Sequence, residues 1–226
     1  MTELIFAALF FLGLHLGIAG TVMRDRAIGK FGETAYRAAF SIFSLLGIFW
    51  LAHAYARADY IETWGQLVGF KPYAAGLMFV AFLLVVLGVS TPNPMAVGGE
   101  KLLCANAPAR GIQRITRHPF LWGVEGWALI HIIANGDVAS LVLFGSLFVM
   151  VLMGMRSIDA KRKKACGQHW EQYAAVTSII PFLAIKEGRN AIVIGEFKWW
   201  QLVVALGLYA AVLHLHQALF GVSAWY

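Results

Sequence analysis

The chain has 226 residues, of which 60% are hydrophobic and only 13% are charged, and its mean hydropathy is +0.70. About a quarter of the residues of a soluble globular domain are charged, so this composition excludes that class and predicts a membrane protein. The net charge of +6 is accounted for by basic loops between apolar stretches and does not indicate nucleic-acid binding.

Six apolar stretches follow one another along the chain, separated by polar or turn-forming segments. They cover residues 4–23, 36–55, 73–89, 119–134, 138–155 and 199–220. An α-helix needs ~20 mostly apolar residues to cross a hydrocarbon core of ~30 Å. The pattern therefore predicts an all-α membrane bundle of about six transmembrane helices, which forms a single domain over residues 1–226.

Basic residues alternate between the loops that separate these stretches. Sixteen of the eighteen Lys and Arg residues fall into alternate loops, and only Arg57 and Lys71 fall into the others. Because cytoplasmic loops retain Lys and Arg, we expect the basic loops on the cytoplasmic side and both termini on the opposite side. The protein is expected in a bacterial inner membrane, with the lipid bilayer as its main partner.

The segment that follows the fifth stretch, about residues 156–198, is the only sizeable aqueous part of the chain. Its basic portion, residues 159–175, is expected to form an amphipathic helix at the membrane interface, with Trp170 and Tyr173 near the headgroups. Cys104 and Cys166 lie in expected cytoplasmic loops, where thiols stay reduced, and they form no CxxC or zinc pattern. We expect neither cysteine to be functional.

Two histidines lie at similar depths within the predicted bundle. At 1.5 Å per residue, His15 lies ~17 Å and His131 ~12 Å from the non-cytoplasmic side of the membrane. Two neutral imidazoles from different helices at one depth suit axial ligation of a haem iron in an apolar bundle. Gly13 and Gly17 flank His15 and leave room for a broad ring, and His214 is a reserve ligand.

A structural role for the two histidines stays open at this point. Polar residues in membrane bundles often bond a carbonyl or hydroxyl group of a neighbouring helix. Close helix packing also uses glycine, so the glycines around His15 do not decide between the two roles.

Four basic residues, Arg37, Arg114, Arg117 and His118, gather near the expected cytoplasmic face. They could bind haem propionates or another acidic ligand, because Arg binds carboxylates through two hydrogen bonds. Interfacial arginines also enforce topology without binding a cofactor. Glu125 lies inside the fourth stretch and needs a partner, and it follows His118 by seven residues on roughly the same helix face. A structural pair and a proton-transfer role both remain for this acid.

Three segments carry a resemblance to a known family. They are GETAYRAAFSIFSL from Gly32 to Leu45, GIQRITRHPFLWGVEGWALIH from Gly111 to His131, and TSIIPFLAIKEGRN from Thr177 to Asn190. In this order they resemble the NnrU and 15-cis-zeta-carotene isomerase family, and the similarity extends over nearly the whole chain.

The resemblance implies a polytopic membrane protein with haem b. The plant isomerase branch binds haem b through two histidines, which match His15 and His131 by position, and isomerises a cis double bond in a carotene precursor. A cysteine implicated in ligand switching stands in that branch three residues before the second histidine, where this chain has Ala128. The bacterial branch, which this sequence resembles more closely, is associated with nitrite and nitric oxide reduction in denitrification. The implied ligand is nitric oxide or a lipophilic polyene.

Two further classes of function remain as alternatives. The segment RHPFLWG, followed by EQY and Pro-Phe, is also similar to membrane methyltransferases of the isoprenylcysteine carboxyl type. In that interpretation Arg117 and His118 bind S-adenosylmethionine, whereas Asp159 stands alone where that family carries further acidic residues. The other alternative is a non-catalytic accessory subunit of a respiratory or reductase complex, which needs no cofactor.

Overall fold

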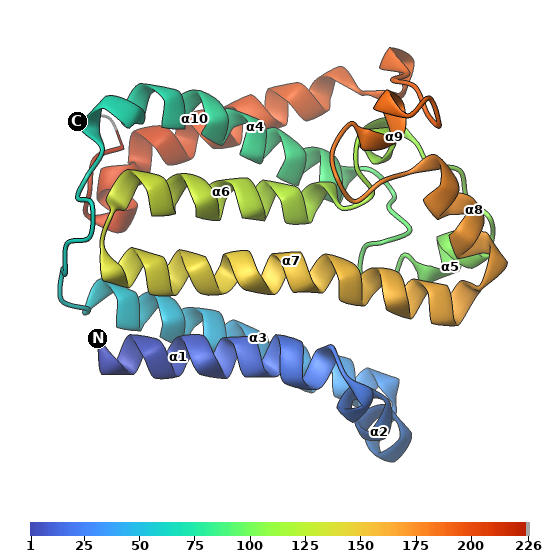
Figure 1. Ribbon diagram of the computed structural model, residues 1–226, viewed down its shortest axis with the longest axis horizontal. Coiled ribbons are helices and arrows are strands. Elements are labelled where there is room, and N and C mark those ends of the chain that lie inside the picture. The colour runs from blue at the N-terminus through green and yellow to red at the C-terminus, as the bar shows by residue number, and fades with distance from the viewer. Residues whose placement is uncertain (225–226) are drawn as a thin grey trace. The chain divides into compact units, whose positions relative to one another are not determined.

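The structure is a computed structural model that describes residues 1–224 (Figure 1). These residues form α-helices joined by short 3₁₀ and π-helical segments, and within them the only β pairing is an isolated bridge between Glu62 and Asp137. The expected all-α architecture is confirmed. A helix bonds the N–H and C=O groups of its own backbone, which is the requirement for a segment that crosses hydrocarbon.

Five helical segments are long and apolar enough to cross a membrane. They are Thr2–Ala19, α3 (Glu33–Ala56), Val68–Ser90, α7 (Val138–Cys166) and α10 (Trp199–Phe220). The remaining expected span, α6 (Pro119–Asn135), is a continuous helix of 17 residues. At 1.5 Å per residue this helix is about 25 Å long, slightly less than the hydrocarbon thickness of about 30 Å.

The chain divides into two compact units. The first comprises Met1–Val68 and Ala128–Gly154, and the second comprises Gly69–Trp127 and the described residues from Met155 onward. In the first unit α1 (Thr2–Leu12) packs along α3 (Figure 1). Gly47 of α3 permits this contact, because an added Cβ would lie only 3.2 Å from ring atoms of Phe10 and Phe11.

The first expected span ends earlier than its hydropathy indicates. α1 continues into a π-helical segment, η1 (Gly13–Ala19), and the chain then turns at Gly20. Thr21 caps α2 (Val22–Phe31) by accepting a hydrogen bond from the backbone N–H of Met23. The span expected to reach residue 23 therefore ends at Ala19, and the first basic residues of the chain lie on α2.

In the second unit α4 (Lys71–Ser90) packs along α10 (Figure 1). Gln201 of α10 donates a hydrogen bond from Nε2 to the hydroxyl of Ser90 at 2.8 Å. The end of α4 also approaches the start of α6, because a Cβ added to Gly88 would lie 2.6 Å from the backbone nitrogen of Phe120. Backbones come this close only where one side chain is missing.

The segment expected to form one interfacial helix over residues 159–175 is helical, but it is divided between two helices. α7 continues to Cys166, Gly167 interrupts the helix with φ +49°, and α8 (Gln168–Val176) follows. Tyr173 is only 4% exposed and belongs to a buried cluster instead of facing the headgroups. The other buried members of that cluster are Met95, Leu103, Ala109 and Cys166.

The expectation of two reduced cysteines is also wrong. Cys104, at the end of α5 (Glu100–Cys104), forms a disulfide with Cys166, and their Cα atoms are 5.1 Å apart. Arg162 strengthens the same connection by donating hydrogen bonds to the carbonyls of Pro94 at 3.1 Å and Ala96 at 2.7 Å. The disulfide and this arginine together tie the end of α7 to the loop that follows α4.

Candidate functional site

A buried polar cluster forms where the loop before α6 meets α7 in the second unit. Asp159 of α7 accepts hydrogen bonds from Nε of Arg117 at 2.9 Å and from Nε2 of His118 at 2.8 Å. All three residues are less than 9% exposed. Two of the expected basic residues, Arg117 and His118, are thus brought together by an acid that is isolated in the sequence.

The protonation state of this cluster follows from its burial. Burial lowers the pKa of His118, and the hydrogen bond to Asp159 opposes that shift without reversing it. At neutral pH His118 is therefore a neutral donor, and Arg117 carries the charge that balances Asp159. A buried charged group is tolerated when it is paired and hydrogen-bonded, as Asp159 and Arg117 are here.

The residues 177–180 hold the cluster in place against the start of α6. The backbone N–H of Arg117 donates to the carbonyl of Ser178 at 2.9 Å. The carbonyl of Ile179 accepts from the hydroxyl of Thr116 at 2.7 Å and from Nε1 of Trp122 at 2.8 Å. Nη1 of Arg117 also donates to the carbonyl of Thr177 at 3.3 Å. This explains why two segments that carry the family resemblance, distant in sequence, lie in contact.

Arg114 has a partner of its own and stands apart from this cluster. Its guanidinium binds both carboxylate oxygens of Glu196 at 2.7 Å, and it also donates to Asn190 at 2.8 Å. The hydrogen bonds that Arg114 donates to Glu196 are the main reason why the pKa of this acid is lowered to about 2. A haem propionate at Arg114 would therefore compete with the Glu196 carboxylate, which Nε and Nη2 of the guanidinium already bind.

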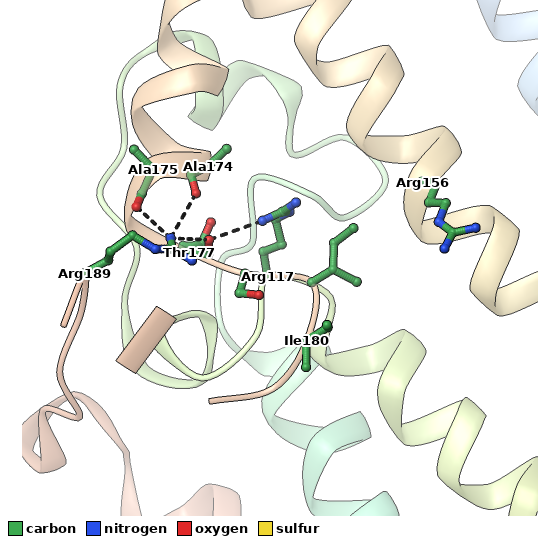
Figure 2. Close-up of a pocket in the computed structure, with 9 residues that line it drawn as sticks. Arg117, Arg156, Ala174, Ala175, Thr177, Ile180 and Arg189 are labelled. Carbon is green, nitrogen blue, oxygen red and sulfur yellow. Dashed lines mark hydrogen bonds between the residues drawn. The ribbon is translucent and has the colours of Figure 1, made fainter. Parts of the chain in front are cut away.

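An open cavity of about 600 Å³ lies beside the buried cluster, within the second unit (Figure 2). Three arginines line it, Arg117, Arg156 and Arg189, and no acidic residue does. Its remaining lining residues are Ala174, Ala175, Thr177, Ser178, Ile179 and Ile180. The sequence does not predict this cavity, because its arginines come from three distant segments and each alone resembles an ordinary interfacial cation.

His15 lies on the π-helical segment η1 in the first unit. Its Nδ1–H donates to the carbonyl of Phe11 at 2.9 Å, and its ring contacts the rings of Phe11 and Phe40 at centroid distances of 4.3 and 5.2 Å. π-Helical turns inside longer helices are frequent at functional sites. The hydrogen bond fixes the proton on Nδ1, so Nε2 keeps its lone pair for a ligand.

An apolar cavity of about 430 Å³ lies next to this histidine, between η1, α2 and α3. Phe40, which contacts the His15 ring, is part of its wall. The other lining residues are Leu14, Ile18, Ala27, Phe31, Ala35, Tyr36, Ala39 and Phe43. With nearly all of its wall apolar, this cavity can accept a hydrophobic molecule.

His131, the second expected ligand, is half-buried on α6, in the part of that helix that belongs to the first unit. Its ring stacks on Phe144 of α7 at a centroid distance of 4.6 Å. Phe144 also contacts the ring of Tyr55 of α3 edge to face at 5.9 Å. Within residues 1–224 no three His, Cys, Asp or Glu side chains gather as a metal-ion site, whereas axial haem ligation needs only two histidines.

The remaining expected site residues lie elsewhere. Arg37 pairs with Glu33 one helical turn away on α3, and both side chains are more than half exposed. His214 is exposed on α10. Glu125 is only 3% exposed, and neither of its oxygens has a hydrogen-bond partner in the described part of the chain. The expected pair between Glu125 and His118 is therefore wrong, because His118 bonds Asp159 instead.

Comparison with known proteins agrees with the resemblance drawn from the three sequence segments. The family model described as NnrU protein matches residues 3–224. The chain is 31% identical over 192 residues to the chloroplastic 15-cis-zeta-carotene isomerase of Arabidopsis thaliana, and the aligned region covers 81% of this chain and 50% of that protein. It is 28% identical over 188 residues to the protein of the same name from Zea mays, and this aligned region covers 80% of this chain and 50% of the relative. The chain thus spans about half the length of these relatives, and no solved structure matches it.

Proposed function

Because the chain belongs to the NnrU protein family, we propose that it is a membrane isomerase acting on a cis double bond of a carotene-like polyene, with haem b held by His15 and His131. Its plant relatives are named for such a reaction. The observation that carries the proposal is the state of His15, whose Nδ1–H is bound by the Phe11 carbonyl while Nε2 keeps its lone pair.

The residues around both histidines fit a flat apolar cofactor. Histidines that bind a metal usually donate their second ring nitrogen to a carbonyl or carboxylate, which fixes the ring and raises its basicity. Phe11 supplies that carbonyl to His15. Phe40 and Phe144 place aromatic rings against the two imidazoles. When bound, haem would supply an iron that acts as a Lewis acid or one-electron partner toward a conjugated chain.

The apolar cavity beside His15 supports a polyene as the substrate. A polyene dissolves in the bilayer and has no polar group for hydrogen bonding, so it is recognised by shape and apolar contact. Phe40 connects the cavity wall to the His15 ring. This chain has Ala128 instead of the cysteine of the plant branch, so control of the reaction by a thiolate at that position is not part of the proposal.

We place the protein in a bacterial inner membrane with the basic loops in the cytoplasm, on the strength of the positive-inside distribution. No residue contact in the described chain favours nitric oxide chemistry in denitrification over the polyene reaction. The methyltransferase alternative requires Arg117 and His118 to bind a cofactor, and both are occupied by Asp159.

Absorption spectroscopy on the full chain, purified in mild detergent and reconstituted with haem b, tests the cofactor. We expect a Soret band in the wild-type protein that is strongly reduced in His15→Ala and in His131→Ala. The matched control is His53→Ala, because His53 is an exposed histidine of the membrane-length helix α3 and its loss should leave the band unchanged.

The reaction is tested on the same proteins in lipid vesicles loaded with 15-cis-zeta-carotene, with the isomers separated by chromatography. We expect conversion by wild-type and His53→Ala protein and none by the two ligand variants. A folded wild-type protein without a Soret band would remove haem from the proposal. Conversion at the wild-type rate by both ligand variants would remove the role given to the histidines.

A further inference from the structure

The cavity lined by Arg117, Arg156 and Arg189 has a charge that is only partly balanced within the protein. Asp159 neutralises Arg117, and Glu187 neutralises Arg189 through a hydrogen bond from Nε at 2.7 Å. No hydrogen bond or ion pair joins Arg156 to any described residue, and Figure 2 draws none between Arg156 and the other residues of the cavity. The cavity therefore keeps one uncompensated positive charge, carried by Arg156.

Arg117 and Arg189 act as rigid parts of the wall and not as free cations. Nη1 of Arg189 donates to the carbonyls of Ala175 at 2.7 Å and Thr177 at 3.0 Å, and Arg117 binds the Thr177 carbonyl from the other side (Figure 2). These hydrogen bonds occupy carbonyls at the end of α8 that have no partner within the helix. They also hold the loop after α8 in shape, so the cavity is formed before any ligand arrives.

The position of Arg156 along α7 places the cavity at the level of the lipid headgroups. The apolar part of α7 runs for 18 residues from Val138 to Met155, which is about 27 Å of helix and close to the hydrocarbon thickness. Arg156 comes directly after it and is exposed. The apolar side chains of Ile179 and Ile180 form another part of the wall, next to the arginines that define its polar part.

We infer that this cavity binds the phosphodiester headgroup of an anionic membrane lipid. A phosphodiester carries a single negative charge, which matches the single uncompensated charge of Arg156, and a guanidinium binds phosphate through two hydrogen bonds. The isoleucines would contact the upper part of the acyl chains. A zwitterionic lipid fits less well, because its ammonium group would meet three guanidinium groups. The inference is independent of the haem proposal, since it uses residues of the second unit alone.

The test uses the full-length protein in a neutral detergent, titrated with a short-chain phosphatidylglycerol, a phosphatidylcholine of the same chain length, or inorganic phosphate. Thermal unfolding and native mass spectrometry report binding. We expect phosphatidylglycerol to raise the unfolding midpoint and to leave one retained lipid per chain. Arg156→Gln should weaken this binding at least about tenfold, the size of a lost charged hydrogen bond.

Arg26→Gln is the matched control, because Arg26 is an exposed arginine of α2 with no hydrogen bond or ion pair among residues 1–224, and its change removes the same charge. Both variants should unfold like the wild type without lipid, since neither arginine makes a hydrogen bond or ion pair with a described residue. Equal binding of phosphatidylglycerol by Arg156→Gln and wild type would overturn the inference. So would an equal loss in both variants, or equal binding of phosphatidylcholine. Inorganic phosphate that matches the lipid in affinity would overturn the lipid as the ligand.

Discussion

Arg117 and Asp159 form a buried ion pair that joins the start of α6 to α7 across 42 residues of sequence. Each side chain is 10% exposed, so neither charge is well solvated by water. The pair also binds His118 and, through Arg117, the loop after α8. One carboxylate therefore fixes the relative position of three segments of the second unit.

The first prediction concerns the removal of this carboxylate. Asp159→Asn leaves the Arg117 charge buried without a counter-ion, so we expect a loss of about 3–5 kcal/mol in the free energy of unfolding. Glu33→Gln is the control, because it breaks an exposed pair with Arg37 on α3, and such pairs contribute within about 0.5 kcal/mol. Unfolding in detergent measures both variants, and an equal effect of the two would contradict a structural role for the buried pair.

The second prediction concerns the pH dependence of the Arg114–Glu196 pair. The pKa of Glu196 is lowered from 4.5 to about 2 in the folded protein, chiefly by hydrogen bonds from Arg114. The unfolded state therefore binds a proton first as the pH falls. The stability that this pair supplies is fully present above about pH 4.5 and is lost as the pH falls toward about 2.

Glu196→Gln isolates this contribution from that of other acids. We expect the unfolding midpoint of wild type to exceed that of the variant at pH 7 and the difference to shrink steadily below pH 4.5. His118 does not affect this comparison, because it is the same in both proteins. A difference that stays constant down to pH 3 would contradict the lowered pKa.

The third prediction concerns the close approach of α4 and α6. A Cβ in Gly88→Ala would meet the backbone of Phe120, with the nitrogen at 2.6 Å and Cα at 2.9 Å. Because backbone atoms cannot rotate away as a side chain can, we expect a destabilisation of about 1–3 kcal/mol.

Gly76→Ala is the matched control on the same helix, since nothing lies within 4 Å of its added Cβ. Alanine is the better helix former, so this variant should be as stable as the wild type or up to about 1 kcal/mol more stable. Thermal unfolding of the two alanine variants side by side tests the prediction. Equal midpoints would mean that α4 and α6 are not in backbone contact.

The helices of this fold follow from hydropathy, whereas several of their ends do not. α10 covers the residues expected of it because charged Lys198 and Gly221, with φ +76°, flank its apolar stretch. The first span ends earlier than expected, since the chain turns at Gly20 although the residues after it remain apolar. α7 continues past its apolar stretch because lysines and arginines are good helix formers and continue the helix outside the bilayer.

The partners of the site residues were harder to predict than the residues themselves. Arg114, Arg117 and His118 were recognised from one short segment, but Glu196 and Asp159 come from segments far along the chain. Only tertiary packing decides such pairings, and the helical spacing between His118 and Glu125 pointed to the wrong acid. The sequence does not predict the disulfide, because both cysteines lie in loops expected in the reducing cytoplasm and form no recognisable spacing pattern.

The last prediction concerns that disulfide. Cys104 and Cys166 are 62 residues apart in sequence. A crosslink over this length lowers the conformational entropy of the unfolded chain and so raises its free energy by about 4 kcal/mol at room temperature. We expect Cys104→Ser and Cys166→Ser each to lower the free energy of unfolding by about this amount. The double variant should be little worse than either, because all three proteins lack the same bond.

Two measurements on the purified protein complete this test. Addition of a reductant should lower the unfolding midpoint of the wild type to that of the variants and leave the variants unchanged. Alkylation of the denatured, unreduced wild-type chain should add no label, since these are its only two cysteines. Two labelled thiols would instead show that the cysteines are reduced, which would contradict the disulfide. Complete protection from the label would confirm the disulfide and, because Cys104 is exposed and thiols in the cytoplasm stay reduced, would count against a cytoplasmic position of the basic loops.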